Sequence, residues 1–281
     1  MNKWIIGARV RTLPAAIAPV LVGTVYANSI NWINAALALI VSLFLQIAVN
    51  YANDYSDGVR GSDTNRVGPI RLVASGLASA KSVKQAAFIS FVVAAVVGLA
   101  LAQLTSLWLI AVGAAAIFAA WTYTGSKRPY GYLGLGEISV FLFFGVVATM
   151  GSYYVQTEKL TWQSFVVAIP MGLLACALLA INNLRDRAQD ELVGKRTLAV
   201  RLGESRARKL FIALLLLAHI SALAVPGKNT LITLALLPQT FIIANQVRSG
   251  ATGPALIPLL GKTGELQIIF TFLLALALVM Y

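Results

Sequence analysis

Carboxylates are scarce in this chain, and most of them stand in two short patches. Six of the ten Asp and Glu residues among 281 fall within the stretches 50–63 and 182–191. They are Asp54, Asp57 and Asp63 in the first stretch, and Asp186, Asp190 and Glu191 in the second. Carboxylates that repel one another need positive charge between them, and hard divalent cations prefer oxygen ligands. The clustering therefore predicts a divalent-cation site.

The spacing within each patch places its polar residues on one face of a helix. Asn50, Asn53, Asp54 and Asp57 stand at i, i+3, i+4 and i+7, which is a single stripe. A second stripe is formed by Asn182, Asn183, Asp186 and Asp190. Two such helix ends facing each other would offer carboxylate and amide oxygens to a shared space, a ligand set that suits Mg²⁺. The Cys and His spacing of a zinc site is absent from the sequence.

Basic residues flank both patches and add the means to bind an anion. They are Arg60, Arg66 and Arg71 near the first patch, and Arg185, Arg187, Lys195, Arg196 and Arg201 near the second. Arg and Lys hold phosphate oxygens that a metal ion bridges, so the combination favours a diphosphate site. A glycine-rich Walker loop is missing, which argues against ATP as the phosphate donor. The alternative is a solvated salt-bridge network, but such pairs contribute little and do not require asparagines on the same stripe.

The rest of the chain is strongly apolar, with 59% hydrophobic and 11% charged residues. Apolar runs of about 17–25 residues indicate membrane-spanning helices, and these runs lack the two-residue alternation of a barrel strand. We expect nine spans, at roughly 13–30, 33–53, 83–102, 105–123, 135–156, 162–182, 209–226, 229–246 and 263–281. The predicted fold class is therefore all-α, a polytopic membrane bundle of nine transmembrane helices. A soluble helical protein is the disfavoured alternative.

The basic residues also predict an orientation in the membrane. With the N-terminus in the cytoplasm, 20 of the 22 Lys and Arg residues fall on the cytoplasmic side, and only Lys159 and Lys228 fall outside. The loops 54–82 and 183–208 then form a cytoplasmic polar cap that contains both acidic patches. Topology and anionic lipid headgroups account for the net charge of +12, so no nucleic-acid partner is expected. The first apolar stretch is expected to be an uncleaved helix rather than a signal peptide.

The two patches resemble a weak internal repeat inside one transmembrane domain that spans residues 1–281. NYANDYSD begins at Asn50 and NNLRDRAQD begins at Asn182, four predicted helices later. A duplicated four-helix unit with one extra helix would give nine. Cys176 and His219 lie inside predicted spans. We expect Cys176 to be a packing residue, and His219 to be a functional candidate or a neutral packed imidazole.

Three loop sequences are long and distinctive. They are NDYSDGVRGSDTNRVGPIRLVASG from Asn53, TYTGSKRPYGYLGLGE from Thr122, and NNLRDRAQDELVGKRTLAVRLG from Asn182. The first and third resemble the two signatures of the UbiA-type intramembrane prenyltransferases. The second resembles the third cytoplasmic loop of the menaquinone-pathway members of that family. The likeness extends over nearly the whole chain through helix count and loop placement.

This resemblance implies a helical bundle around a central cavity in the cell membrane, capped on the cytoplasmic side. It also implies Mg²⁺-dependent transfer of a polyprenyl group from polyprenyl diphosphate to 1,4-dihydroxy-2-naphthoate. Carbon dioxide and diphosphate would leave, giving a demethylmenaquinone. Another acceptor, such as 4-hydroxybenzoate, a chlorophyllide or haem, is an alternative within the same architecture. An ion-coupled transporter is disfavoured because its acids should lie near the bilayer midplane rather than at helix ends.

The resemblance also assigns roles to individual residues. The metal ligands implied are Asn50, Asp54 and Asp57 for one ion, and Asp186 and Asp190 for a second. The broad family pattern has an acid where this chain has Gly61, so Asp63, two residues later, is a further candidate ligand. The implied diphosphate or acceptor contacts are Arg60, Arg66, Arg71, Lys127, Arg128 and Lys195. Further expected substrate contacts are Asn53, Tyr123, Tyr130, Asn182, Asn183 and Arg201.

Two further groups complete the predicted site. Glu137, at the start of a predicted span, is a candidate base or acceptor-orienting group beside the catalytic carboxylates. Its alternative is a carboxylate satisfied by the helix dipole. Aromatic residues near the cytoplasmic helix ends could face an allylic cation or could form an interfacial belt. They are Tyr51, Tyr55, Trp121, Tyr123, Tyr130 and Tyr132.

Overall fold

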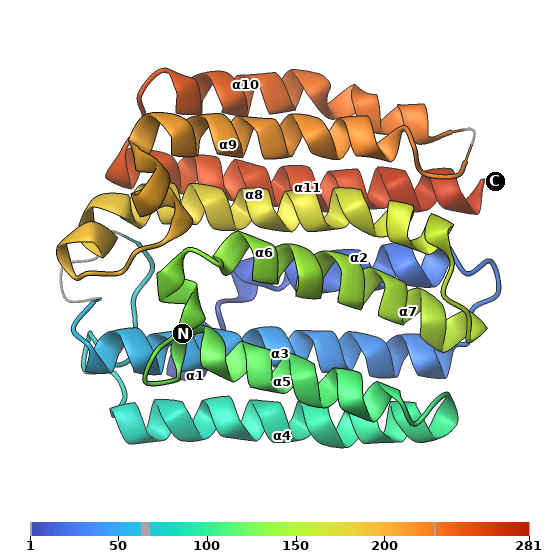
Figure 1. Ribbon diagram of the computed structural model, residues 1–281, viewed down its shortest axis with the longest axis horizontal. Coiled ribbons are helices and arrows are strands. Elements are labelled where there is room, and N and C mark those ends of the chain that lie inside the picture. Colours follow the sequence, from blue (N-terminus) through green and yellow to red (C-terminus); the bar gives the residue numbers. More distant parts are fainter. Residues whose placement is uncertain (1, 63–67, 228, 281) are drawn as a thin grey trace.

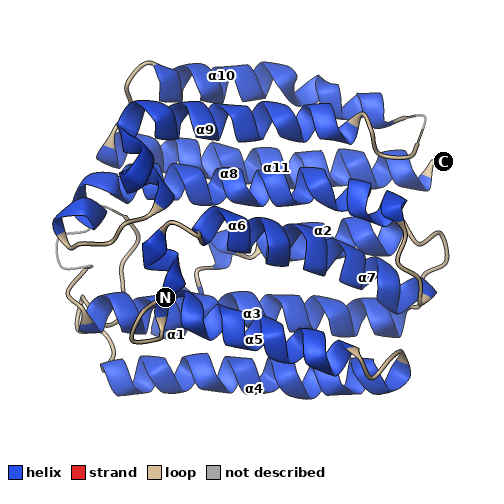
Figure 2. Ribbon diagram, in the orientation of Figure 1, coloured by secondary structure: helices blue, strands red, loops and turns tan. Residues whose placement is uncertain are grey.

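The protein is a bundle of helices whose long axes run in nearly the same direction (Figure 1, Figure 2). The computed structural model describes residues 2–62, 68–227 and 229–280, and every regular element within these ranges is helical. The prediction of an all-α fold is therefore confirmed for the described part of the chain.

The elements fall into an N-terminal and a C-terminal set. The first set is α1 (Lys3–Ala8), η1 (Val10–Thr12), α2 (Pro14–Val25), α3 (Trp32–Val59), α4 (Ala80–Leu104), α5 (Leu109–Thr124), η2 (Tyr130–Leu133), α6 (Gly136–Val140), η3 (Phe141–Val147) and α7 (Ala148–Thr157). The second set is α8 (Trp162–Leu192), α9 (Leu198–Ala222), η4 (Thr230–Leu236), α10 (Leu237–Arg248), η5 (Gly253–Ala255) and α11 (Leu256–Val279).

Each of the nine predicted spans overlaps helical elements, but the count of nine is not confirmed. The predicted span 135–156 covers α6, η3 and α7, and 229–246 covers η4 and α10. Six helices among the described residues are long and apolar enough to cross a membrane, and the bent pair Lys3–Thr12 and Pro14–Val25 would make a seventh. Helix α5 is apolar but has only 16 residues. Helix α9 is long enough, but its first half carries Glu204, Arg206, Arg208 and Lys209. Charge and length therefore separate these two helices from the other predicted spans.

The two helices that carry the acidic patches are longer than predicted. Helix α3 begins where the Asn31 side chain accepts hydrogen bonds from the backbone N–H groups of Ile33 and Asn34. Helix α8 begins with a capping box between Thr161 and Ser164. They continue for 28 and 31 residues, so the patches lie on the last turns of continuous helices. A long, capped helix holds its polar end rigidly with respect to the apolar bundle.

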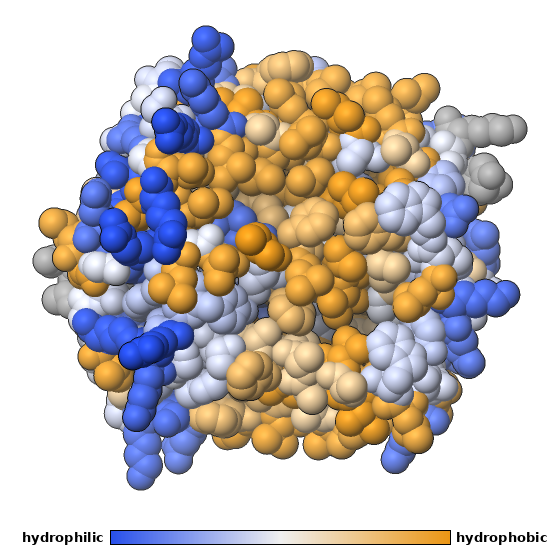
Figure 3. All heavy atoms as spheres, viewed as in Figure 1, coloured by the Kyte–Doolittle hydropathy of each residue, from blue (hydrophilic) through white to orange (hydrophobic). Residues whose placement is uncertain are grey.

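The loops that follow α3, α5 and α8 gather at the same end of the bundle, at the left in Figure 1, while the C-terminus lies at the opposite end. Figure 3 shows apolar residues covering the middle of the molecule and hydrophilic residues at its two ends. This distribution is that of a multi-pass membrane protein with its polar groups outside the hydrocarbon layer.

Helix α8 lies in the interior of the bundle and contacts α2, α7, α9 and α11. Its residues Met171, Leu174 and Ile181 are fully buried in the main apolar cluster, together with Phe211 of α9 and Phe270 of α11. The second patch therefore extends from α8, the most buried of the six candidate spans among the described residues.

The span α6–η3–α7 packs on α8 through glycines. Its middle part, Phe141–Val147, is a π-helix, a form that is frequent at functional sites. A Cβ atom added to Gly145 would lie 2.6 Å from the Gly172 Cα on α8, so the two backbones are in direct contact. Small residues commonly allow such approaches between membrane helices.

This contact predicts a difference between two glycines of the same span. Gly145→Ala should destabilise the protein by about 1–3 kcal/mol, because the added methyl group meets backbone that cannot rotate away. Gly151→Ala is the matched control, since nothing lies within 4 Å of a Cβ at that position. Thermal unfolding in detergent measures both variants. Equal melting temperatures for the two would contradict the packing described here.

Candidate active site

The two acidic patches meet at a single lysine. The Lys195 Nζ atom lies 3.6 Å from Asp57 Oδ2 on α3 and 3.7 Å from Asp190 Oδ1 on α8. Both aspartates are buried, with 3% and 6% of their surface exposed. Buried carboxylates are stable as anions only when a cation or hydrogen bonds compensate them. The ends of α3 and α8, far apart in the sequence, therefore share one positive charge.

Tyr132 of η2 completes the surroundings of Asp57. Its hydroxyl donates a hydrogen bond to Asp57 Oδ1, and the Lys195 Nζ atom lies 5.0 Å from the centre of its ring. Burial, followed by the negative charge of Asp57, raises the pKa of the Tyr132 hydroxyl above its ordinary value. Tyr132 is therefore a protonated donor at neutral pH, and it links the 125–135 loop to the acidic centre.

Asp54 has a different environment from Asp57. Its Oδ2 accepts a hydrogen bond of 2.8 Å from the Leu72 backbone N–H, and its Oδ1 accepts one of 3.0 Å from that of Val73. Leu72 is fully buried against Tyr51 and neighbouring residues. In this structure Asp54 fixes the segment after residue 67 onto α3, and any metal it binds must use the remaining lone pairs of its oxygens.

The two asparagines of the first stripe hold neighbouring segments. The Asn50 amide donates hydrogen bonds of 2.9 Å to the Ala8 carbonyl and to Thr12 Oγ1, which attaches the N-terminal segment to α3. Asn53 Oδ1 accepts a hydrogen bond from the hydroxyl of Thr124, at the end of α5. Their contacts in this structure are with protein groups that set the positions of the surrounding helices.

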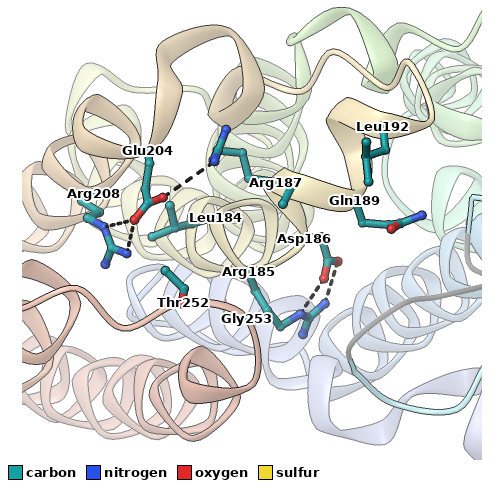
Figure 4. A pocket seen from close by; sticks show the side chains of 11 residues that line it. Leu184, Arg185, Asp186, Arg187, Gln189, Leu192, Glu204, Arg208, Thr252 and Gly253 are labelled. Atoms are coloured by element: carbon teal, nitrogen blue, oxygen red, sulfur yellow. Dashed lines mark hydrogen bonds and ion pairs between the residues drawn. The ribbon is translucent and has the colours of Figure 1, made fainter.

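On α8, Asp186 forms a bidentate ion pair with the adjacent Arg185. The Arg185 Nε and Nη2 atoms lie 2.7 Å from the two carboxylate oxygens, and Nη2 also donates to Asn182 Oδ1 at 2.9 Å. Figure 4 shows this pair beside a second group, in which Glu204 of α9 contacts Arg187 and Arg208. The residues drawn there line a cavity of about 350 Å³ between the end of α8, the start of α9 and η5.

Glu137 lies deeper in the bundle, at the first turn of α6. Its Oε1 accepts a hydrogen bond of 3.2 Å from the Asn183 amide, and its backbone carbonyl accepts one from the Cys176 thiol. Its Oε2 is buried and has no hydrogen-bond partner of normal geometry among the described residues. The carboxylate is thus held by α8 through Oε1, and apart from its own backbone N–H no further described group engages it.

The remaining predicted residues are distributed over the same end of the molecule. Arg60 donates to the carbonyls of Thr124 and Ser126 and lies over the Tyr132 ring, so it braces the 125–135 loop. Lys127 and Arg128 are exposed on that loop, whereas Arg71 is buried. Tyr130 and Arg201 are the outer groups of the site. The Tyr130 hydroxyl donates a hydrogen bond to the Ala119 carbonyl and shares another with the Ser139 hydroxyl. Arg201 donates to the Arg196 carbonyl. Asp63 and Arg66 lie outside the described residues.

Tyr123 packs edge-to-face with Tyr130, with 5.4 Å between ring centres. Tyr55 and Trp121 are also predicted to face a cation, and in this structure that cation is the ammonium of Lys84. Lys84 Nζ lies 5.4 Å from the Tyr55 ring centre and 5.8 Å from that of Trp121. These two aromatic residues therefore form part of a separate cluster on α3, α4 and α5.

The donor set fits an open Mg²⁺ site better than a closed one. Within the described ranges, no group of three or more Asp, Glu, His or Cys side chains gathers as a cage. Asp57 and Asp190 already share a cation, and Mg²⁺ is usually bound by one or two carboxylates with substrate phosphates completing its coordination. These two residues are the first candidates to hold it.

Comparison with known proteins identifies the family of the chain. The sequence profile of the UbiA prenyltransferase family matches residues 16–252, most of the chain. The chain belongs to this family. Both acidic patches lie inside the matched region, as do Glu137 and Lys195.

Family relatives cover most or all of the chain. The 1,4-dihydroxy-2-naphthoate octaprenyltransferase of Mycobacterium tuberculosis is 47% identical over 283 residues, covering 98% of this chain and 96% of that protein. The enzyme of the same name from Escherichia coli is 43% identical and covers 76% of this chain and 73% of its own length. The structure of a UbiA homologue from Archaeoglobus fulgidus, bound to DMAPP and Mg²⁺, has a TM-score of 0.67, 17% identity and 99% coverage of both chains. This last likeness shows the UbiA fold of the bundle.

Sequence reasoning found the carboxylates and Lys195, but it named Tyr132 only among the aromatic residues that could face an allylic cation and not as a hydrogen-bond partner of Asp57. Tyr132 stands in the loop motif that resembles the menaquinone-pathway members of the UbiA family, beside the predicted Tyr130. Which of these two tyrosines contacts an acid depends on how the short η2 helix turns, and the motif alone does not determine that.

The hydrogen bonds of Asp54 predict a local effect of its removal. Asp54→Ala should remove the acceptor of one buried and one part-buried backbone N–H group, at a cost of about 1–3 kcal/mol, and should loosen the segment from residue 68 to 79. Hydrogen exchange measured by mass spectrometry should show faster exchange at Leu72 and Val73. Asp190→Ala is the control, because its carboxylate contacts Lys195 instead. Unchanged protection at Leu72 in Asp54→Ala would contradict this role.

Proposed function

We propose that this protein transfers a polyprenyl group from polyprenyl diphosphate to 1,4-dihydroxy-2-naphthoate, with loss of CO₂ and diphosphate. The product is a demethylmenaquinone in its reduced form. The observation that carries the proposal is the meeting of Asp57 and Asp190 around Lys195 at the polar end of a membrane bundle. The names of relatives at 47% and 43% identity support the choice of acceptor.

The diphosphate end of the donor binds where α3 and α8 meet. Asp57 and Asp190 would hold Mg²⁺, with Asp54, Asp186, Asn50 and Asp63 as the further proposed ligands. Bound there, the ion would neutralise the charge that develops on the departing diphosphate. Lys195 lies at the same point and would contact the phosphate oxygens of the bound donor, because its ammonium is a point charge on a flexible side chain. Arg66, Arg71, Lys127 and Arg128 supply further positive charge from the surrounding loops.

The prenyl chain occupies the apolar part of the bundle. Its allylic carbon becomes cationic as the bond to diphosphate breaks, and a site that excludes water protects such a cation from hydrolysis. The faces of Tyr123, Tyr130 and Tyr132, which lie on α5 and η2 beside the acidic centre, favour positive charge. The acceptor ring approaches from the side of Asn53, Asn182 and Asn183, and Arg201 lies at the rim.

We further propose the orientation and organisation of the chain in the membrane. The N-terminus and the loops after α3, α5 and α8 face the cytoplasm, because the basic residues gather there. The site then opens to the cytoplasm. The diphosphate of the donor and the carboxylate of the acceptor can reach it from there, because both are charged and soluble in water. Residues 1–281 form one nine-span domain in the cytoplasmic membrane, and the pairs α3–α4 and α8–α9 correspond in the internal repeat.

An assay of the purified protein tests the reaction. With a polyprenyl diphosphate, 1,4-dihydroxy-2-naphthoate and Mg²⁺, we expect a prenylated naphthalenediol and one CO₂ per turnover. EDTA should abolish turnover and added Mg²⁺ should restore it. Donors of several chain lengths identify the preferred isoprenoid. Prenylation of 4-hydroxybenzoate but not of the naphthoate would overturn the proposed acceptor, and no product with any aromatic acceptor would overturn the proposed reaction.

The shared position of Asp57 and Asp190 predicts that both are required. Asp57→Asn and Asp190→Asn should each lower kcat at least about 100-fold, because each loses a charge that holds the diphosphate-binding cation. They should also raise the Mg²⁺ concentration needed for half-maximal rate. Glu265→Gln, at an exposed position of α11, is the control and should have normal rates. Normal Mg²⁺ dependence in both aspartate variants would exclude these residues as metal ligands.

A further inference from the structure

Glu137 is a buried carboxylate, and one of its oxygens makes no hydrogen bond to another described residue. Only 8% of its surface is exposed, and Asn183 engages Oε1 while Oε2 is without a partner among the described residues. A buried polar atom without a hydrogen bond costs free energy, so such atoms in a folded protein call for an explanation. A substrate group that binds to Oε2 would provide one.

The position of Glu137 fits a substrate that lies inward of the diphosphate. Its partner Asn183 stands seven residues before Asp190 on α8, which corresponds to about 10 Å along the helix axis. The Tyr123 hydroxyl lies close to the start of α6. A Cβ atom added to Gly136, the residue before Glu137, would be 3.0 Å from that hydroxyl. Glu137 therefore lies between the charged end of the bundle and its apolar interior, at the depth where a naphthalene ring with polar substituents would lie once the diphosphate is bound at Lys195.

The other candidate carboxylates of the described site are already engaged. Asp54 accepts two backbone hydrogen bonds, and Asp186 is paired with Arg185. Asp57 and Asp190 share Lys195, at the place assigned above to the diphosphate. Of these five, Glu137 is the one with a buried oxygen available to a neutral hydroxyl group.

We propose that Glu137 takes the proton of the acceptor hydroxyl next to the reacting carbon and returns it after CO₂ has left. This inference rests on the proposed function and adds a base to it. Asn183 is the positioning residue, because its hydrogen bond to Oε1 leaves Oε2 directed at the substrate side. The carboxylate needs no exchange of protons with water during a turnover.

The steps balance in atoms and electrons. The ring carbon that bears the carboxylate forms a bond to the first carbon of the prenyl chain, while the bond from that carbon to the diphosphate oxygen breaks and diphosphate leaves with the electron pair. The neighbouring hydroxyl gives its proton to Oε2, and its electron pair forms a carbonyl. The resulting β-keto carboxylate loses CO₂, and the electrons of the broken C–C bond form an enolate. Its oxygen takes the proton back from Glu137, which restores the aromatic diol.

Glu137→Gln tests this role, because glutamine keeps an acceptor for Asn183 and removes the base. We expect kcat to fall by about 10²- to 10⁴-fold, the usual contribution of a positioned base, with an unchanged KM for the polyprenyl diphosphate. The residual rate should rise with pH, because an acceptor that is already ionised needs no base. Acceptor analogues with more acidic hydroxyl groups should reduce the deficit in the same way.

Two further variants separate chemistry from folding. Glu137→Asp retains a carboxylate and should recover part of kcat without the rise of rate with pH. Glu158→Gln, at an exposed carboxylate after α7, should behave as wild type. A near-normal kcat for Glu137→Gln, or a loss that neither pH nor acceptor acidity alters, would overturn the inference. Failure of the wild-type protein to prenylate dihydroxynaphthoate would instead overturn the proposed function.

Discussion

The ammonium of Lys195 between Asp57 and Asp190 is the interaction on which the arrangement of the site depends. It joins the ends of α3 and α8, which are separated by more than a hundred residues, into one charged centre. Two buried carboxylates repel each other strongly where water is scarce, so a cation must lie between them. In the proposed function, the same requirement would let the pair bind a divalent cation together with an anionic substrate. Lys195 therefore holds Asp57 and Asp190 close together, in the arrangement that a metal diphosphate complex would need.

The rest of the polar end holds this centre in position. Asp54 fixes the segment after residue 67 through two backbone hydrogen bonds, and Asn50 attaches the N-terminal segment to α3. Tyr132 and Arg60 connect the 125–135 loop to the same helix. Each of these groups is part of an acidic or basic motif, yet its contacts in this structure are structural. A site that must bind and release a lipid diphosphate gains from such support, because its ligands are then preorganised.

The bundle separates two kinds of chemistry along the axis of α8. Asp190 and Asp186 stand at its polar end, where loops rich in Arg and Lys can contact phosphate oxygens. Asn183 and Glu137 lie further in, beside the π-helical part of the span that contacts α8 through Gly145 and Gly172. In the proposed mechanism, departure of the diphosphate and handling of the acceptor proton would therefore occur at different depths. With this separation, the acceptor hydroxyl would give its proton to Glu137 and not to the aspartates that would hold the metal.

Much of this molecule is determined locally and can be predicted from the sequence. Apolar runs and caps determine the helices, and the i, i+3, i+4 and i+7 spacing places Asn50, Asn53, Asp54 and Asp57 on one stripe of α3. The loop motifs are sufficient to predict the UbiA family. The number of spans is not determined locally, because α5 is short and α9 mixes charge with apolar residues, and such segments depend on their neighbours for burial.

Only the tertiary structure decided which group each carboxylate contacts. Spacing fixes the face of a helix, but not what is packed against that face. For this reason Asp54 and Asp57, three residues apart, could be predicted only as equivalent ligands. In the fold one accepts hydrogen bonds from backbone N–H groups, and the other contacts a tyrosine and a lysine from distant loops. The tertiary structure also decides the contacts of Glu137. The packing of α6 against α8 places Asn183 at Oε1 and leaves the buried Oε2 without another described residue as a partner.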